Sequence, residues 1–194
     1  AAFQPVAAMN PCPCGRCGDA GGDCRCTPAQ VRCYRGRLSG PLLDRLDMHV
    51  EVPRLAAQDF AAPVSAETTA GAAARVGLAR RVQLARPGIC NARLDDGGVQ
   101  RWCRPDEPAQ RLLAQAMERF ALSGRARQRG LKVARTVADL EGAPALTAAH
   151  VGVALTLRCL DRGSRRGRML RGLAQRGREG EIQQVIGLLD RARR

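Results

Sequence analysis

Six cysteines within residues 12–33 have the types and spacing that most clearly indicate chemistry. They follow the order Cys12-x-Cys14-x2-Cys17-x6-Cys24-x-Cys26-x6-Cys33. The pairs Cys12/Cys14 and Cys24/Cys26 supply four thiolates, the number that a tetrahedral structural zinc requires. Cys-x-Cys is a rarer spacing than Cys-x2-Cys, and Cys17 offers a Cys14-x2-Cys17 pair. Reduced or redox-active thiols are therefore the alternative to zinc.

The chain shows neither a secretory signal pattern nor a run of about 18 apolar residues. We therefore expect a cytoplasmic protein without a membrane span, in which the nine cysteines stay reduced rather than forming disulfides. Three of them, Cys90, Cys103 and Cys159, stand alone in the sequence and are expected to be small buried hydrophobic residues.

The formal charge of +14 on 194 residues favours anionic partners, such as nucleotide phosphates or nucleic acid. Every basic residue except Lys132 is an arginine, a bias that a GC-rich coding sequence explains equally well. Aromatic residues make up only 3% of the chain, too few for a platform that stacks successive bases. Any DNA binding should therefore be sequence-independent, through the phosphate backbone, and weakened by salt.

Other polar residues with chemical potential lie at the ends of predicted elements. Residues 6–9 predict a buried strand that ends at Asn10. Ser39 can cap a short helix that ends near Asp44 and Arg45. Residues 46–52 alternate between apolar and polar side chains, which predicts a strand with His49 on its exposed face.

The second half of the sequence predicts a small helical bundle. A first helix is expected from about Thr68 to Arg86, and a loop with a turn at 95–98 and an anchor at Trp102 is expected over 88–104. Further helices should follow Asp106, Ser123 and Thr147. In the first helix the predicted inward residues are Val76, Leu78, Ala79, Val82 and Ala85, and the predicted outward ones are Arg75, Arg80, Arg81 and Arg86.

Arg125 falls in the first turn of the helix that Ser123 begins. A cation is disfavoured there by the helix dipole, so its presence needs another reason. A bound phosphate is one such reason, and a simply solvated arginine is the alternative.

The predicted organisation has four parts. Residues 1–55 form one domain, residues 56–66 a linker, residues 67–163 the helical bundle and residues 164–194 a basic tail. The tail is open to three interpretations, a partner helix, an interfacial helix or a flexible arm, and we favour an arm with a weak terminal helix.

Four stretches of the chain carry a resemblance to a known family. They are Ala8-Met9-Asn10-Pro11-Cys12-Pro13-Cys14-Gly15, Cys24-Arg25-Cys26-Thr27-Pro28, Leu38-Ser39-Gly40-Pro41-Leu42-Leu43-Asp44-Arg45-Leu46-Asp47 and Val133-Ala134-Arg135-Thr136-Val137-Ala138-Asp139-Leu140. Over residues 3 to about 163 the sequence resembles the magnesium-chelatase ChlI-like AAA+ ATPases, the YifB/ComM family. The resemblance implies an α/β fold class, the C-terminal part of a P-loop AAA+ module with a cysteine-rich insertion, followed by an all-α lid.

The resemblance also implies roles in ATP hydrolysis. Asn10 would be sensor 1, which positions the attacking water. Arg45, oriented by Asp44, would be an arginine finger acting on the nucleotide of a neighbouring subunit, and Arg125 would be sensor 2 on its own subunit's nucleotide. ATP and Mg²⁺ would be the cofactors of a homohexameric ring that remodels DNA, as a helicase or in branch migration.

The sequence departs from the pattern of this family at several points, which leaves alternative functions open. It contains no Gly-x4-Gly-Lys-Ser/Thr loop and no acidic Walker B strand, so this chain alone is expected to be inactive. Arg16-Cys17 after the Cys-Gly pair and Gly130 in the lid helix are also unusual. A non-catalytic, zinc-containing nucleic-acid-binding module is the main alternative. A chelatase-type motor subunit is a further one, against which the cysteine cluster argues.

Overall fold

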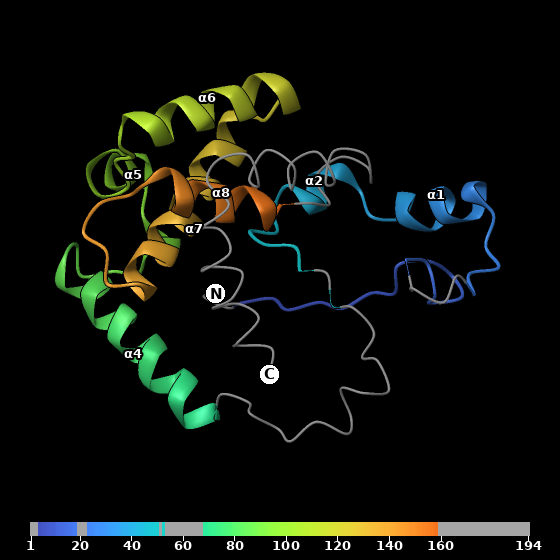
Figure 1. Cartoon of the computed structure of the whole chain (residues 1–194), viewed down its shortest axis with the longest axis horizontal. Helices are drawn as coiled ribbons and strands as arrows, with labels where there is room; N and C mark the ends of the chain where they lie inside the picture. Colours follow the sequence, from blue (N-terminus) through green and yellow to red (C-terminus); the bar gives the residue numbers. More distant parts are fainter. Residues whose placement is uncertain (1–3, 19–22, 51, 53–67, 159–194) are drawn as a thin grey trace. The chain divides into compact units, whose positions relative to one another are not determined.

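The computed structural model describes residues 4–18, 23–50, 52 and 68–158 (Figure 1). The chain divides into two compact units, Ala1–Leu43 with Glu51–Ala62, and Asp44–Val50 with Pro63–Arg194. The predicted linker, the basic tail and Cys159 lie outside the described residues. No helix within the described residues is both long and apolar enough to cross a membrane.

The first unit contains two helices in its described part, α1 (Pro28–Gly36) and α2 (Gly40–Leu43). The sequence analysis did not predict α1. Thr27 begins it with a capping box, in which its hydroxyl accepts from the Gln30 backbone N–H and the Gln30 side chain accepts from the Thr27 N–H. The predicted cap of α2 is confirmed, since the Ser39 hydroxyl accepts from the Leu42 N–H at 3.3 Å.

The second unit is a helical bundle, as predicted. Its elements are α4 (Thr69–Ala85), η1 (Asn91–Arg93), α5 (Asp96–Trp102), α6 (Glu107–Phe120), α7 (Gly124–Leu140) and α8 (Ala148–Thr156). Helix α7 is the central element, because it packs against α4, η1, α5 and α8. Threonine, aspartate or serine begins each long helix, and the predicted cap at Ser123 accepts the Ala126 N–H at 3.1 Å.

The core of this unit gathers apolar side chains from residues 94–155, both from the helices after η1 and from the segments between them. Its largest fully buried aliphatic members are Leu146, Val99 and Val151, and Phe120 lies beside them. Cys103 is buried in this core, as expected of a small hydrophobic residue. Trp102 packs against the core and confirms the predicted anchor.

The predicted loop over residues 88–104 is wrong, because this segment contains η1 and α5. Asp95 is the N-cap of α5 and accepts the Gly98 N–H at 2.7 Å. Asp-Asp-Gly-Gly is a common turn sequence, so residues 95–98 were predicted as a turn rather than as the start of a helix. Gly98 has a packing role, since a Cβ there would come within 2.9 Å of the Leu94 side chain.

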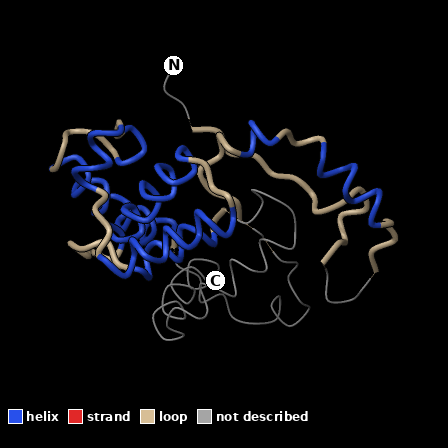
Figure 2. The backbone as a smooth tube through the Cα atoms, turned by 90° about the horizontal axis from the view of Figure 1, so that it is seen from above, coloured by secondary structure: helices blue, strands red, loops and turns tan. Residues whose placement is uncertain are grey.

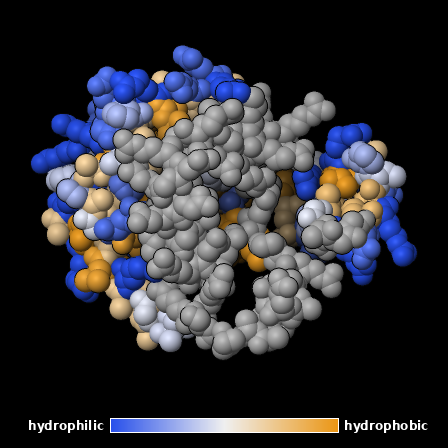
Figure 3. Space-filling view, in the orientation of Figure 1, coloured by the Kyte–Doolittle hydropathy of each residue, from blue (hydrophilic) through white to orange (hydrophobic). Residues whose placement is uncertain are grey.

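The predicted inward face of α4 is also largely wrong. Ala79 is buried as expected, but Gln83 is the other buried residue, whereas Leu78 and Val82 are exposed. The small Ala79 allows close approach to the bundle, and Gln83 is buried because its Oε1 accepts the Asn91 N–H. Apolar side chains therefore lie exposed among hydrophilic ones over α4 (Figure 3).

The described residues form helices and loops, and they contain no strand (Figure 2). Residues 6–10 are exposed and unpaired as a strand, with Val6 88% exposed. In the predicted strand over 46–52 the burial is inverted at its centre, because His49 is buried while Met48 and Val50 are exposed. A strand is completed by a neighbour that shares its ladder of hydrogen bonds, which the described residues do not supply.

Candidate metal centre and exposed arginines

The first unit brings together the four cysteines predicted as metal ligands. The sulfur atoms of Cys12, Cys14, Cys24 and Cys26 all lie within 4.8 Å of one another. Three of the separations are 3.4, 3.8 and 3.7 Å. Four sulfurs at about 2.3 Å from a tetrahedral zinc ion would lie about 3.8 Å apart, so the cluster fits one such ion.

Local backbone geometry holds the first cysteine pair in place. The Gly15 N–H donates to the Cys12 carbonyl at 3.0 Å, and Gly15 has a φ of +79°, a conformation that favours glycine. Arg35 on α1 donates through Nε to the Pro11 carbonyl at 3.1 Å, which joins the helix to the cysteine loop. Cys17 and Cys33 are not part of this cluster, so the geometry favours the Cys12/Cys14 and Cys24/Cys26 pairs over the alternative Cys14/Cys17 pairing.

The thiols of the cluster influence one another's protonation. The backbone N–H of Arg16 is the largest of several interactions that lower the pKa of Cys14 to about 6. The backbone N–H of Cys26 lowers the pKa of Cys24, but burial and the neighbouring sulfurs outweigh it, so that the pKa of Cys24 rises to about 12. Four thiolates this close together require a positive charge between them, which a metal ion supplies.

Little else is buried in the described part of the first unit. Cys12 is fully buried, and it is the one buried residue among positions 4–18 and 23–43. Helix α1 has no buried residue. Burial of apolar surface therefore contributes little to the stability of this part of the chain.

The structure places Asn10 beside the cysteine loop. It is exposed, and a Cβ added at Gly15 would lie 3.8 Å from its Cγ and Nδ2 atoms. Asn10 belongs to the first unit, whereas Asp44, Arg45 and Arg125 belong to the second.

In the second unit, Arg125 lies on α7, and another residue of α7 contacts the backbone of Arg45. Arg125 is exposed in the first turn of α7, which carries no acidic residue. One turn later on that helix, Arg129 donates through Nη1 to the carbonyl oxygen of Arg45 and, at 2.9 Å, to Oδ1 of Asp47. Asp44 and Arg45 are exposed. The backbone of Arg45 is thus bound by a side chain of α7 that begins about one helical turn from Arg125.

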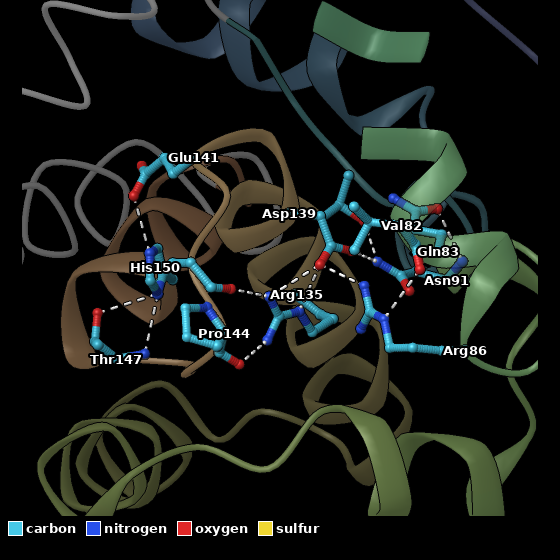
Figure 4. Close-up of polar contacts among 12 residues, drawn as sticks. Val82, Gln83, Arg86, Asn91, Arg135, Asp139, Glu141, Pro144, Thr147 and His150 are labelled. Atoms are coloured by element: carbon cyan, nitrogen blue, oxygen red, sulfur yellow. Dashed lines mark hydrogen bonds and ion pairs between the residues drawn. The ribbon is translucent and has the colours of Figure 1, made fainter. Parts of the chain in front are cut away.

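The second half of α7 carries a buried polar network (Figure 4). Asp139 Oδ1 accepts from Arg86 Nη2 and from Arg135 Nε, the latter at 2.9 Å. Its other oxygen accepts from Asn91 Nδ2 at 2.8 Å. Arg135 also donates through Nη1 to the carbonyl oxygen of Pro144 and through Nη2 to that of Ala143. The network joins α4, η1 and α7 through one buried carboxylate.

Sequence reasoning missed this network. Arg86 was predicted to point outward, but it is half-buried against Asp139. The available signal was an arginine and an aspartate four residues apart, Arg135 and Asp139, within an otherwise apolar helix stripe. Oppositely charged residues at this spacing on a buried helix face indicate a buried ion pair.

A smaller polar cluster joins the end of α7 to the start of α8 (Figure 4). The Thr147 N–H donates to Nδ1 of His150 at 3.0 Å. The other ring nitrogen of His150 lies 2.9 Å from Glu141 Oε2. Because Nδ1 accepts a backbone N–H, the ring carries its hydrogen on Nε2 and donates it to Glu141.

Known protein families match both parts of this chain. Residues 66–158 match the family model described as magnesium chelatase, subunit ChlI C-terminal. Residues 1–60 match the model described as magnesium chelatase, subunit ChlI. The first of these matches covers the helical bundle, and the second covers the cysteine cluster.

Individual relatives agree with this assignment. The chain is 39% identical to the uncharacterized protein YifB of Escherichia coli (strain K12) over 163 residues, and 39% identical to the competence protein ComM of Haemophilus influenzae over the same length. Each alignment covers 84% of this chain and 32% of the relative. An uncharacterized protein of Mycobacterium tuberculosis (strain H37Rv) is 41% identical over 162 residues, 81% of this chain and 32% of that protein.

The fold and the matched segments define a magnesium-chelatase-like protein. Specifically, the chain belongs to the YifB/ComM family. It spans about a third of the length of the curated relatives it matches.

Proposed function

We propose that this chain is the C-terminal portion of a AAA+ ATPase that couples ATP hydrolysis to DNA remodelling in a homohexameric ring. Membership of the YifB/ComM family supports the ATPase assignment, and the name of the Haemophilus relative, a competence protein, supports DNA as the substrate. In this proposal residues 1–55 end the α/β AAA+ core and residues 67–163 form its lid. Nucleotide and Mg²⁺ would be held mainly by a P-loop and a Walker B strand, which this chain does not contain.

One observation carries the proposal more than any other. Arg45 and Arg125 are both exposed, and α7 connects them through Arg129. Two exposed cations on one helical unit suit transfer of a phosphoryl group, where positioned positive charge stabilises the transition state. In this proposal Arg45 is the arginine finger, Asp44 orients it, Arg125 is sensor 2 and Asn10 is sensor 1.

The test of this function is ATP hydrolysis by a YifB chimera, in which residues 1–158 replace the matching part of the E. coli relative. We expect the chimera to turn over ATP faster when DNA is present. Binding of DNA by the chimera without any ATP turnover would instead favour the second candidate, a non-catalytic basic module. The four clustered cysteines and the exposed arginines are the observations that favour that candidate.

We further propose that the cysteine cluster holds one structural zinc ion through Cys12, Cys14, Cys24 and Cys26. The sulfur separations fit tetrahedral coordination, and the ion would supply the stability that apolar burial does not provide in this unit. The ion's role would be structural, because all four positions would be filled by cysteine and none would be open to water.

The 194-residue chain should therefore bind close to one zinc ion when purified under reducing conditions. Cys12→Ser should remove it, because three thiolates leave an open position in the least exposed part of the site. Cys33→Ser is the matched control, since Cys33 is exposed on α1 outside the cluster. Elemental analysis of the purified proteins gives the stoichiometry. Zinc far below one per chain in the unmodified protein would refute the proposed site.

For DNA we expect weak, sequence-independent binding by the 194-residue chain that fades as salt rises. A plot of the logarithm of the DNA-binding constant against the logarithm of salt concentration has a negative slope. Replacing the exposed Arg80 and Arg81 on α4 by glutamine should make this slope less steep, by about 0.9 for each phosphate that the variant no longer neutralises. Arg111→Gln is the control, because its guanidinium already pairs with Glu107. Fluorescence anisotropy with duplex and single-stranded DNA measures the affinity and its salt dependence for each protein. Binding that is insensitive to salt, or specific for one sequence, would contradict the expectation.

A further inference from the structure

The segment that follows Arg45 is attached to the helical bundle at three points. Arg129 on α7 binds the Arg45 carbonyl and the Asp47 carboxylate. Near the end of α8, Arg158 Nη1 donates to the Leu46 carbonyl at 3.4 Å, and the Leu157 carbonyl accepts the His49 N–H. The backbone around Arg45 is thus fixed to α7 and α8, while Arg45 itself is exposed.

Arg129 differs from the other two attachments because it lies on the same helix as Arg125. Positions 125 and 129 are four residues apart, so their side chains project from one face of α7. Arg129 also makes its two bonds through a single nitrogen, one to a peptide carbonyl and one to a carboxylate. Arg129 therefore links α7 directly to the peptide that carries Arg45.

We propose that Arg129 is a positioning residue that couples the nucleotide contact of Arg125 to the placement of Arg45. This inference rests on the proposed function, in which Arg125 senses the subunit's own nucleotide and Arg45 acts on the nucleotide of the neighbour. When Arg125 engages phosphate, the movement of α7 is transmitted through Arg129 to the Arg45 backbone. The state of one nucleotide site would thereby set the activity of the next.

A simple surface ion pair is the competing explanation. Side chains of Arg129 and Asp47 are 31% and 56% exposed, and pairs of this kind contribute little to stability. The competing explanation predicts no effect on turnover. The coupling role predicts that an Arg129 variant loses turnover and, like Arg45→Ala and unlike Arg125→Ala, is rescued in mixed rings.

The first measurement uses hydrogen exchange in the 194-residue chain. Arg129→Ala should speed amide exchange over residues 44–50 at least several-fold and leave the protection of the α7–α8 core unchanged. Arg127→Ala is the matched control, an arginine of the same helix that takes no part in this contact. Unchanged exchange over residues 44–50 would overturn the proposed tether.

The second measurement uses turnover in the YifB chimera. Arg129→Ala should lower kcat about tenfold with little change in KM, and Arg129→Lys should recover part of it. Mixing Arg129→Ala subunits with subunits that cannot bind ATP but keep Arg45 and Arg129 should restore some hydrolysis. Full activity of Arg129→Ala, beside an inactive Arg45→Ala, would overturn the coupling alone. Full activity of Arg45→Ala would instead overturn the proposed function itself.

Discussion

Replacing Arg45 by alanine in the YifB chimera is expected to lower ATP turnover by about 10³- to 10⁵-fold, the range found for arginine fingers. The guanidinium would meet charge that develops as the γ-phosphate departs, so its loss should reduce kcat more than ATP binding. Arg45 is exposed, and residues of this kind seldom affect stability by more than about 0.5 kcal/mol. The measurement is steady-state hydrolysis, with a denaturation curve of each variant to establish that it is folded.

Mixed rings distinguish Arg45 from Arg125. Arg45→Ala subunits still bind ATP, so partners that cannot bind ATP but keep their own Arg45 should restore part of the turnover. Arg125→Ala should not be rescued, because its defect lies at the nucleotide of its own subunit. Equal rescue of the two variants would show that the cis and trans roles proposed for them do not hold in this chain.

The second large effect concerns the buried carboxylate of Asp139. Asp139→Ala should reduce the free energy of unfolding of the helical unit by about 3–5 kcal/mol, because it leaves buried arginine charge without its partner. Asp139 is 4% exposed and accepts from Arg86, Arg135 and Asn91. Urea denaturation of the 194-residue chain, followed by circular dichroism, measures the change.

Two controls give this prediction its meaning. Glu107→Ala removes the carboxylate of an exposed ion pair with Arg111 and should cost at most about 1 kcal/mol. Replacing Arg86, Arg135 and Asp139 together by apolar residues of similar size should recover much of the lost stability, since no orphaned charge remains. A loss below about 1 kcal/mol for Asp139→Ala would mean that the network does not join α4, η1 and α7 as described.

Features with local determinants could be predicted from the sequence. Ser39 and Ser123 are confirmed caps, because a cap depends on residues three positions apart. Cys12, Cys14, Cys24 and Cys26 were selected by spacing alone, and the structure brings their sulfurs together. Their identity as zinc ligands, and the roles of Asn10, Asp44, Arg45 and Arg125, stay predictions.

Burial that depends on distant partners could not be predicted from the sequence. Leu78 and Val82 were expected inside α4, but the side that faces α7 is set by Ala79 and by the polar contacts of Gln83. His49 was expected on an exposed strand face, yet its backbone bonds to the end of α8. A periodic pattern reports that a face is apolar and does not report which neighbour reaches it.

Burial confined to Cys12 in the described part of the first unit has a consequence for how this region tolerates mutation. In an ordinary domain, substitutions at many core positions each cost stability, so tolerance declines gradually from surface to centre. Here most side chains have no packing to lose, whereas the four clustered thiols and the left-handed Gly15 have no substitute. Sequence variation should therefore be almost absent at those five positions and at Asn10, the proposed sensor 1, and extensive at most other positions of this region.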